Sequence, residues 1–415
     1  MSKLALVLSA GGARGAYEAG VIHYIRTALP KKSAQRNFNI FTGTSVGAIN
    51  TVGMVAMAND PALQGEWLKS MWFSIRQGNI YRRDLTATTH FLGSTFGGVL
   101  RNLLTFNPFN IAKRKGAHFE SFLDTQPLKK YLKKSINWNH VDQNITKGPV
   151  DAVAINVTNL TNGRNELFLQ KKRSTHYRGH YICHRGPITP DHIMASAAIP
   201  IIFPPQKIGR SYYADGGLRL FTPMSPAIQL GADRLLVIGL RKRALPNKPY
   251  MGKSRPDKST PTIAEQMGRL LNGLFLDRIE SDMEQLSRVN AIIETGESVY
   301  GKDFLPKVNT KMKKVGYDID IAKRGLRKIK ALEIQPSEFI NSIFLNWFHR
   351  EEKHFKFSAL EKMLVRLLDI DPTTGSDLLS YLIFAPHYVR DLFELGFQDA
   401  KSQRKELIDI LSEDA

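Results

Sequence analysis

The sequence predicts an α/β protein with a mainly parallel central sheet, followed by a mostly helical C-terminal region. Two observations support this prediction. Short apolar segments typical of buried strands alternate with helical segments through the first 240 residues. Beyond residue 260, apolar residues recur at helical spacing. Because strands that alternate with helices usually form layers, we expect helices to pack around a mainly parallel sheet.

Residue types and the positions of glycines predict the individual elements of the first 240 residues. The predicted strands are Leu4–Ser9, Phe38–Thr42, Val150–Val157 and Arg234–Leu240, and the predicted helices are Ala16–Leu29 and Val46–Ala58. Glycine-rich turns join the first strand to the first helix and the second strand to the second helix. The turns at these two junctions are therefore the places to look for a functional site.

A change of composition separates this part from the rest of the chain. Residues Arg241–Thr260 hold seven Lys or Arg, one acid and three prolines, which predicts a basic linker or exposed loop. Apolar residues from Ile263 to Phe275 then fit one helix face, with Thr262 as a plausible N-cap. We therefore predict an α/β domain at 1–240, a linker at 241–260 and a helical region at 261–415.

The composition limits the compartment and the partners. The 415 residues carry a formal net charge of +20, which favours an anionic partner such as a lipid surface or nucleic acid. The single cysteine, Cys183, excludes an intramolecular disulfide. The apolar run Leu4–Leu8 is too short for a signal-peptide core, and no run is long enough to span a membrane. We expect a cytoplasmic protein that contacts a membrane, if at all, at its surface.

The first candidate for chemistry is Ser45, in the sequence G-T-S-V-G between a predicted strand and a predicted helix. A serine on such a tight turn exposes its hydroxyl oxygen, and flanking glycines relieve crowding of the backbone. This motif is common in turns that have no catalytic role. A nucleophilic serine also needs a base and hydrogen-bond donors for the oxyanion.

The glycine-rich stretch Ser9–Gly15 is suited to supply those donors. Its backbone N–H groups lie between a strand and a helix N-terminus, where they can converge on an anion. A dinucleotide site would require G-x-G-x-x-G and a later acidic residue, but Ala10 replaces the first glycine and Thr27–Gln35 holds no acid. Ser9–Gly15 also lacks the G-K-[ST] sequence of a phosphate-binding loop. We therefore interpret this stretch as an oxyanion hole.

The candidate base is Asp215, which precedes Gly216 and Gly217. A carboxylate at such a turn can accept the serine proton without a histidine, although an Asp-Gly hairpin turn would look the same. The late histidines His349, His354 and His387 have no motif around them, and we interpret them as surface or core residues.

Together these motifs resemble the patatin-like phospholipase family. In chain order they are A-G-G-A-R-G at Ala10–Gly15, G-T-S-V-G at Gly43–Gly47 and D-G-G at Asp215–Gly217. Further segments that look like the family are Thr158–Arg164, Ala195–Pro205 and Gly231–Asp233. The similarity covers roughly Leu4–Leu240, and Leu378–Ala400 resembles a segment near the C-terminus of longer bacterial members.

The resemblance implies a three-layer α/β/α fold, with Ser45 as nucleophile and Asp215 as general base of a Ser–Asp dyad. It assigns the oxyanion amides to Gly11, Gly12, Ala13 and Arg14, and supporting turns to Gly15, Gly43, Gly47, Gly216 and Gly217. The family usually has glycine where Ala10 stands, so this loop departs from the pattern.

The implied activity is hydrolysis of a phospholipid or lysophospholipid through an acyl-enzyme, with no metal and no cofactor. Two alternatives stay open: an acyltransferase that uses the same acyl-enzyme, and a non-catalytic lipid-binding or regulatory protein. The irregular stretch 76–118 is either a core helix with loops or a lid that admits acyl chains. The sequence does not define the oligomeric state.

Two further clusters have alternative interpretations. His176, His180, Cys183 and His184 include zinc-ligand types, but no second cluster accompanies them, so we expect a solvated loop. Residues Lys302–Lys330 hold ten Lys or Arg with interleaved apolar residues, which fits either a solvated face or a surface that docks on anionic lipid. No nucleic-acid motif is present, so we expect no nucleic-acid partner.

Overall fold

The structure is a computed structural model that describes residues 2–83, 121–177, 179–242, 278–315, 326–351, 357–359, 361–362 and 376–412. Three predicted segments lie wholly or mostly outside these residues: the stretch 76–118, interpreted as a core helix with loops or a lid, the linker or loop at 241–260, and the helix at 262–275.

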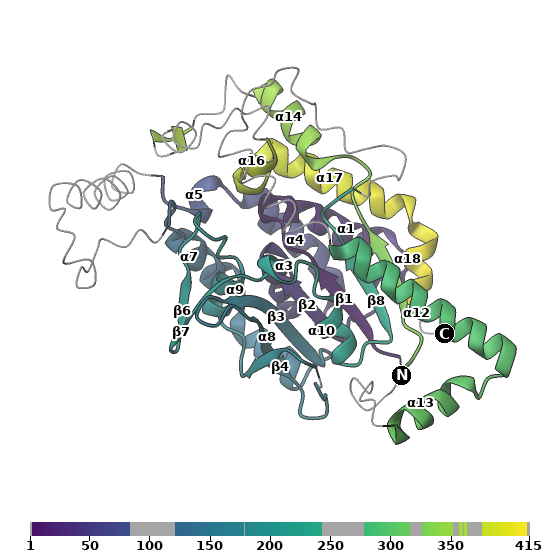
Figure 1. The fold of residues 1–415 in the computed structure, drawn as a ribbon. Helices are drawn as coiled ribbons and strands as arrows, with labels where there is room; N and C mark the ends of the chain where they lie inside the picture. The colour runs from purple at the N-terminus through teal and green to yellow at the C-terminus, as the bar shows by residue number, and fades with distance from the viewer. Residues whose placement is uncertain are drawn as a thin grey trace, which may run out of the picture.

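The described residues form a mixed sheet of nine strands in which most neighbours are parallel (Figure 1). The strands are β1 (Leu4–Leu8), β2 (Ile40–Thr44), β3 (Ala152–Asn159), β4 (Asn165–Lys171), β5 (Ile182–Arg185), β6 (Gln206–Ile208), β7 (Ser211–Asp215), β8 (Arg234–Ile238) and β9 (Lys330–Ile334). The main order is β5-β4-β3-β2-β1-β8-β9, and β7 pairs antiparallel with the end of β3 and with β6. All four predicted strands are confirmed, with ends shifted by at most two residues.

Helices occupy most of the remaining described chain. They are α1 (Gly15–Ala28), α2 (Lys31–Ala34), α3 (Val46–Ala56), α4 (Pro61–Ser74), α5 (Gln77–Ile80), α7 (Gln126–Ser135), α8 (Trp138–Thr146), α9 (Pro190–Ser196), α10 (Met224–Gln229), α12 (Arg278–Tyr300), α13 (Phe304–Lys314), α14 (Ile340–Glu351), α16 (Ser376–Leu382), α17 (Pro386–Ser402) and α18 (Arg404–Leu411). Short 3-10 turns, η1 (Gly12–Arg14) and η3 (Gly216–Leu218), follow β1 and β7.

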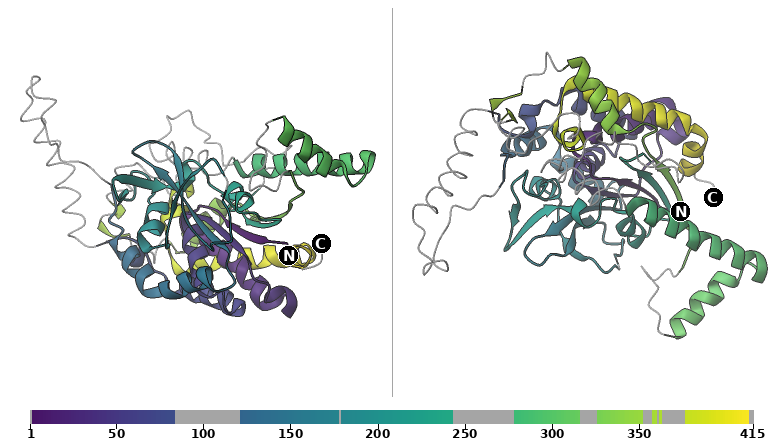
Figure 2. Two further views of the ribbon diagram at one scale, coloured as in Figure 1. Left: turned by 90° about the horizontal axis from the view of Figure 1, so that it is seen from below. Right: turned by 45° about the horizontal axis from the view of Figure 1, so that its top comes forward.

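The fold has three layers because strand side chains alternate between the two faces of the sheet. On β1, Leu4, Leu6 and Leu8 join an apolar cluster with residues of α1, α3 and α4. Ala5 and Val7 join a second cluster on the opposite face, with residues of α10 and α12. This arrangement confirms the predicted α/β/α fold, and Figure 2 shows it from two further directions.

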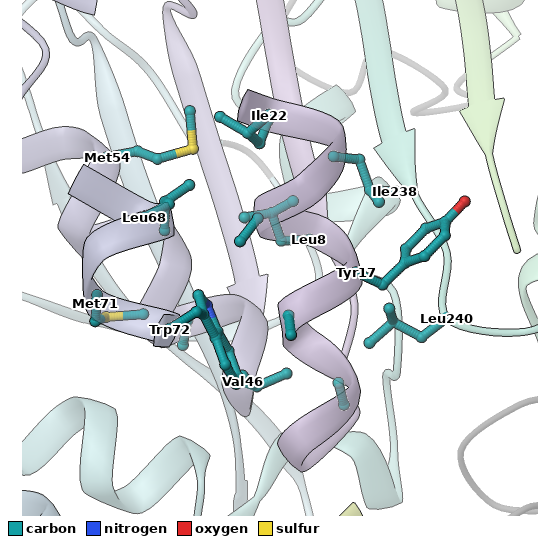
Figure 3. Packing of buried hydrophobic residues seen from close by; sticks show 14 of the residues in the cluster. Leu8, Tyr17, Ile22, Val46, Met54, Leu68, Met71, Trp72, Ile238 and Leu240 are labelled. Atoms are coloured by element: carbon teal, nitrogen blue, oxygen red, sulfur yellow. The ribbon is translucent and has the colours of Figure 1, made fainter. Parts of the chain in front are cut away.

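The apolar packing is dense beneath the two glycine-rich turns. Leu8, at the end of β1, and Val46, at the start of α3, belong to one buried cluster with Trp72 (Figure 3). The Trp72 Nε1–H donates to Asn50 Oδ1 at 3.0 Å, so the indole is fixed by a hydrogen bond as well as by packing. Full burial of a large side chain stabilises a fold by about 1.5–3 kcal/mol. The turns therefore rest on a rigid base.

The C-terminal region packs against this core. The strand β9 pairs in parallel with β8 and extends the sheet. The helix α17 lies along α1, where the Tyr17 hydroxyl donates to Asp399 Oδ2 at 3.0 Å and Phe397 meets Tyr24 edge-on. Helices supply most of the described part of this region, and the boundaries at 240 and 260 stay a prediction.

Candidate active site

Ser45 occupies a strained turn between β2 and α3. Its φ of 55° and ψ of −122° lie in a region that residues with a side chain rarely adopt. Ser45 and Ile201 are the two non-glycine residues with positive φ in the described chain. Such a conformation costs on the order of 1–3 kcal/mol, so the surrounding structure must hold it. This geometry is typical of a serine presented at the tip of a nucleophile elbow.

The glycines around Ser45 are required by close backbone contacts. A Cβ atom on Gly47 would lie 2.5 Å from the carbonyl oxygen of Leu8. A Cβ on Gly43 would lie 2.5 Å from the carbonyl oxygen of Gly47. The G-x-S-x-G spacing therefore lets the start of α3 sit directly on the end of β1.

Ser196, at the C-terminal end of α9, holds the backbone of Ser45 in place. The Ser45 N–H donates to Ser196 Oγ at 2.8 Å, and this hydroxyl donates to the Asn156 carbonyl at 2.7 Å. All three residues are buried. Sequence reasoning did not assign this role, although Ser196 lies in the segment Ala195–Pro205 that resembles the family.

Asp215 lies at the end of β7, where that strand pairs with β3 and reaches the Ser45 turn. Its Oδ1 accepts the Gly217 N–H at 2.8 Å, and its carboxyl group is a hydrogen-bond partner of the Ser45 side chain. Burial raises the pKa of Asp215 from 3.8 to about 7, and the hydrogen bonds from Ser45 and Gly217 oppose this only in part. The structure thus brings together two residues that are 170 positions apart.

The stretch Gly11–Arg14 forms a tight turn, η1, between β1 and α1. Gly12 and Ser45 line the same small cavity. Gly12 has a φ of 56°, and a Cβ there would lie 2.3 Å from the Tyr381 carbonyl oxygen, so a glycine is needed. The Arg14 N–H donates to the Gly11 carbonyl at 3.1 Å, and its guanidinium points to α16. Of the four predicted oxyanion residues, Gly12 shares this cavity with Ser45, and the Arg14 amide already has an acceptor.

A buried acid that sequence reasoning missed, Glu18, ties the elements beneath the site. Its carboxylate accepts the Ser9 N–H at 2.8 Å and the Asn50 Nδ2–H at 2.8 Å. Full burial raises the pKa of Glu18 from 4.5 to about 8, although both hydrogen bonds lower it. Ser9 directly follows β1, while Glu18 belongs to α1 and Asn50 to α3, so this acid joins the two turns of the site.

The cavity at Ser45 is small and apolar. It has a volume of ≈ 40 Å³ and is lined by Gly12, Ser45, Val46, Ile49, Met71, Trp72, Ile75, Ile80, Leu128, Tyr131, Leu132, Ala197, Ile199, Phe203 and Phe384. A larger hollow of ≈ 330 Å³ lies between β5, α9 and the β6–β7 hairpin, and neither Ser45 nor Asp215 lines it. Of these two cavities, the small apolar one adjoins Ser45.

The His176–His184 segment shows no metal-binding arrangement in the part of the chain that the structure describes, where no group of three or more His, Cys, Asp or Glu is placed to hold an ion. His184 Nε2 instead lies 2.6 Å from Glu166 Oε2, and burial raises the pKa of the Cys183 thiol. Over the same described residues, no helix combines the length and apolarity needed to cross a bilayer.

Comparison with known proteins gives three findings. The family model of the patatin-like phospholipases matches residues 6–228, more than half of the chain. A curated relative from Pseudomonas aeruginosa (strain BWHPSA011 / Pa011), described as a cGAMP-activated phospholipase, is 28% identical over 217 residues, or 51% of this chain and 52% of the relative. The chain thus spans about half the length of that relative. Among solved structures, VipD from Legionella pneumophila aligns with 97% of this chain and 67% of its own, at 11% identity and a TM-score of 0.30.

Proposed function

The chain belongs to the patatin-like phospholipase family, and we propose that it is a serine-dependent lipid acyl hydrolase of the phospholipase A or lysophospholipase type. The observation that carries this proposal is the pairing of Ser45, on its strained turn, with the buried carboxyl group of Asp215. A base is most effective when its pKa lies near the operating pH, and the pKa of Asp215 is raised to about 7.

In the proposed first step, Ser45 Oγ attacks the acyl carbonyl carbon of the lipid and Asp215 accepts the hydroxyl proton. The tetrahedral intermediate collapses as the bond to the leaving oxygen breaks, and Asp215 returns the proton to that oxygen. Water then attacks the acyl-enzyme, again with Asp215 as base, and releases the fatty acid and free Ser45.

The oxyanion of both steps needs donors that are fixed before reaction. We assign this role to the amides of Gly11, Gly12 and Ala13, because Gly12 shares the cavity with Ser45. The Arg14 amide donates to Gly11, so in this proposal Arg14 holds the shape of the loop.

The proposed membrane contact is the end of α12 with α13, which lead away from the sheet layers (Figures 1 and 2). None of the α13 residues is buried, and its lysines are Lys307, Lys311, Lys313 and Lys314. Large apolar side chains nearby are exposed: Val299 by 65%, Tyr300 by 71% and Val315 by 58%. Basic residues beside exposed apolar ones suit an anionic bilayer surface. Residues 316–325 of the predicted basic segment lie outside the described chain.

The test of catalysis compares wild type, Ser45→Ala and Asp215→Asn, with Ser402→Ala as a matched serine control on α17. Each protein is treated with a fluorophosphonate probe and assayed for fatty-acid release from mixed phospholipid vesicles. One arm includes cGAMP, because the Pseudomonas relative is described as cGAMP-activated. We expect labelling and release in wild type and control, loss of both in Ser45→Ala, and loss of release in Asp215→Asn. Full hydrolysis by Ser45→Ala would refute the proposal.

The two alternatives give different products. An acyltransferase would move the acyl group to an added lysolipid or alcohol in place of water, which product analysis detects. A lipid-binding protein without catalysis would bind vesicles, release no acyl group in either arm, and bind equally well as Ser45→Ala.

The membrane contact is tested by sedimentation with phosphatidylserine and phosphatidylcholine vesicles. The triple variant Lys311→Glu, Lys313→Glu, Lys314→Glu should lose binding to the anionic vesicles, since each basic residue near the surface contributes on the order of 1 kcal/mol. The control triple variant changes Lys31, Lys32 and Lys401 to Glu, which alters net charge equally. Equal losses in both triple variants would show that net charge, and not α13, drives binding.

A further inference from the structure

A segment far along the chain, residues 377–384, reaches the candidate active site. Among the described residues that line the apolar cavity at Ser45, Phe384 alone comes from the C-terminal region. Its side chain is 7% exposed, and its ring stacks on Trp72 with 6.2 Å between centroids and 10° between planes. Phe384 therefore forms a wall of the cavity that the catalytic domain does not supply itself.

The cavity behind this wall is too small for an acyl chain of ordinary length. Its ≈ 40 Å³ is well below the roughly 300–1,000 Å³ of typical ligand pockets. Most of the other lining side chains also belong to the central apolar core, so they have little freedom to withdraw. Phe384 belongs to the same core, but it lies within the short connection between α16 and α17, in a separate part of the chain, so its ring is the wall whose removal would enlarge the cavity.

The Gln77 side chain fixes Phe384 from one side. Its Nε2–H donates to the Leu382 carbonyl at 2.8 Å, and its Oε1 accepts the Phe384 N–H at 2.6 Å. Gln77 is 4% exposed, so these bonds form away from water. A buried amide that satisfies both a carbonyl and an N–H of the same short stretch sets the position of that stretch.

The guanidinium of Arg14 fixes the segment from the other side. It donates to Ser380 Oγ from Nε at 3.0 Å and from Nη2 at 2.6 Å. Its Nη1 donates to the Tyr381 hydroxyl at 3.1 Å, and its Cζ lies 3.9 Å from the centre of the Tyr381 ring. Arg14 is part of the turn assigned to the oxyanion, and the Tyr381 carbonyl packs on Gly12. The wall and the oxyanion turn therefore share one set of contacts.

We propose that Phe384 determines the length of acyl chain that the site accepts, and that Gln77 and Arg14 are positioning residues that hold its segment over Ser45. This inference rests on the proposed function in assuming that an acyl chain occupies the cavity. Removing the ring extends the cavity, and releasing Gln77 lets the ring move aside. Changes at Arg14 disturb the oxyanion turn as well as the wall.

The test uses the full chain and two readouts. The first is kcat/KM for esters with eight-carbon and sixteen-carbon acyl chains. The second is binding of the corresponding fatty acids to variants in a Ser45→Ala background, which requires no hydrolysis. The variants are Phe384→Ala, Phe384→Trp and Gln77→Leu, and the control is Phe348→Ala, which removes a ring of similar burial in α14 that does not line the cavity.

We expect Phe384→Ala and Gln77→Leu to raise the sixteen-carbon to eight-carbon ratio by about tenfold in both readouts, and Phe384→Trp to lower it. The control should leave the ratio unchanged even if it lowers the melting temperature. An altered binding ratio in protein that hydrolyses no ester would refute the proposed function and retain this inference. Unaltered ratios in folded variants would overturn the inference, whether or not the wild type hydrolyses lipid.

Arg14 is tested by its effect on turnover. Arg14→Lys keeps the charge but loses the two-point contact with Ser380, so the fold-decrease in kcat should exceed the fold-change in KM. Ser380→Ala should reproduce part of that decrease in kcat. A change in KM alone, or equal activity of Arg14→Lys and wild type, would show that the guanidinium does not position the oxyanion turn.

Discussion

Replacing Asp215 with asparagine should remove hydrolysis and stabilise the protein at neutral pH. The folded protein keeps the Asp215 proton up to about pH 7, whereas an unfolded chain releases it near the ordinary aspartate pKa of 3.8. The folded state therefore binds more protons between these values, and its stability falls as the pH rises through that window. The slope is about 1.4 kcal/mol per pH unit for a single group. Asparagine has no such charge, so the variant escapes this loss.

The measurement is the free energy of unfolding of wild type and Asp215→Asn in urea at pH 5, 6, 7 and 8. The free energy of unfolding of Asp215→Asn minus that of wild type should grow by about 3 kcal/mol between pH 5 and pH 8 and change little above pH 8. Asp191→Asn is the control, because the Asp191 side chain is 49% exposed and pairs with Lys129. Parallel pH profiles for wild type and Asp215→Asn would refute the conclusion that Asp215 is a buried base with a raised pKa.

Three other substitutions test the support of the site. Ser196→Ala leaves the buried Ser45 N–H without its acceptor, so the free energy of unfolding should fall by about 1–3 kcal/mol and kcat should fall as well. An unchanged kcat would argue against a role of Ser196 in holding the Ser45 turn. Gly47→Ala places a Cβ 2.5 Å from the Leu8 carbonyl oxygen and should lower the melting temperature, whereas Gly78→Ala, with nothing within 4 Å of its Cβ, should not. Glu18→Ala leaves the Ser9 N–H and the Asn50 side-chain amide without their acceptor. The free energy of unfolding should fall by several kcal/mol, on the order of 1–3 kcal/mol for each of these two donors. Because the raised pKa of Glu18 makes wild type less stable as the pH rises from about 4.5 to about 8, that loss should be smaller at pH 8 than at pH 5.

The parts of the site that could be predicted from sequence are those encoded by short local motifs. The strand-turn-helix around Ser45 is encoded in ten consecutive residues, and its strain requires glycines at fixed spacing. The buried parallel strands β1 and β8 were predictable because both of their faces are apolar. Asp215 was predictable only as the third motif of an ordered set, since an Asp-Gly turn alone carries little information.

The parts that escaped prediction depend on contacts between distant residues. Ser196 meets Ser45 across 151 positions, and Gln77 meets Phe384 across 307. Neither has a local pattern that separates it from other buried polar residues. The strand β9 was also missed, because its residues K-A-L-E-I mix charged and apolar types and only the last is buried. As the outer neighbour of β8 it needs no fully apolar sequence.

The two acids at the site show how burial serves different purposes within one fold. Glu18 has hydrogen-bond donors from Ser9 and Asn50 and is completely enclosed, so its environment suits a structural acid. Asp215 is equally buried, but one of its partners is the Ser45 side chain, which a reaction would remove from it. The desolvation cost of the buried negative charge on Asp215 is relieved when the carboxylate accepts the serine proton and becomes neutral. Enclosure of this carboxyl group thus destabilises the resting ionised state relative to the protonated state that follows attack. In the proposed mechanism, that difference gives a carboxylate without a histidine enough basicity to activate Ser45.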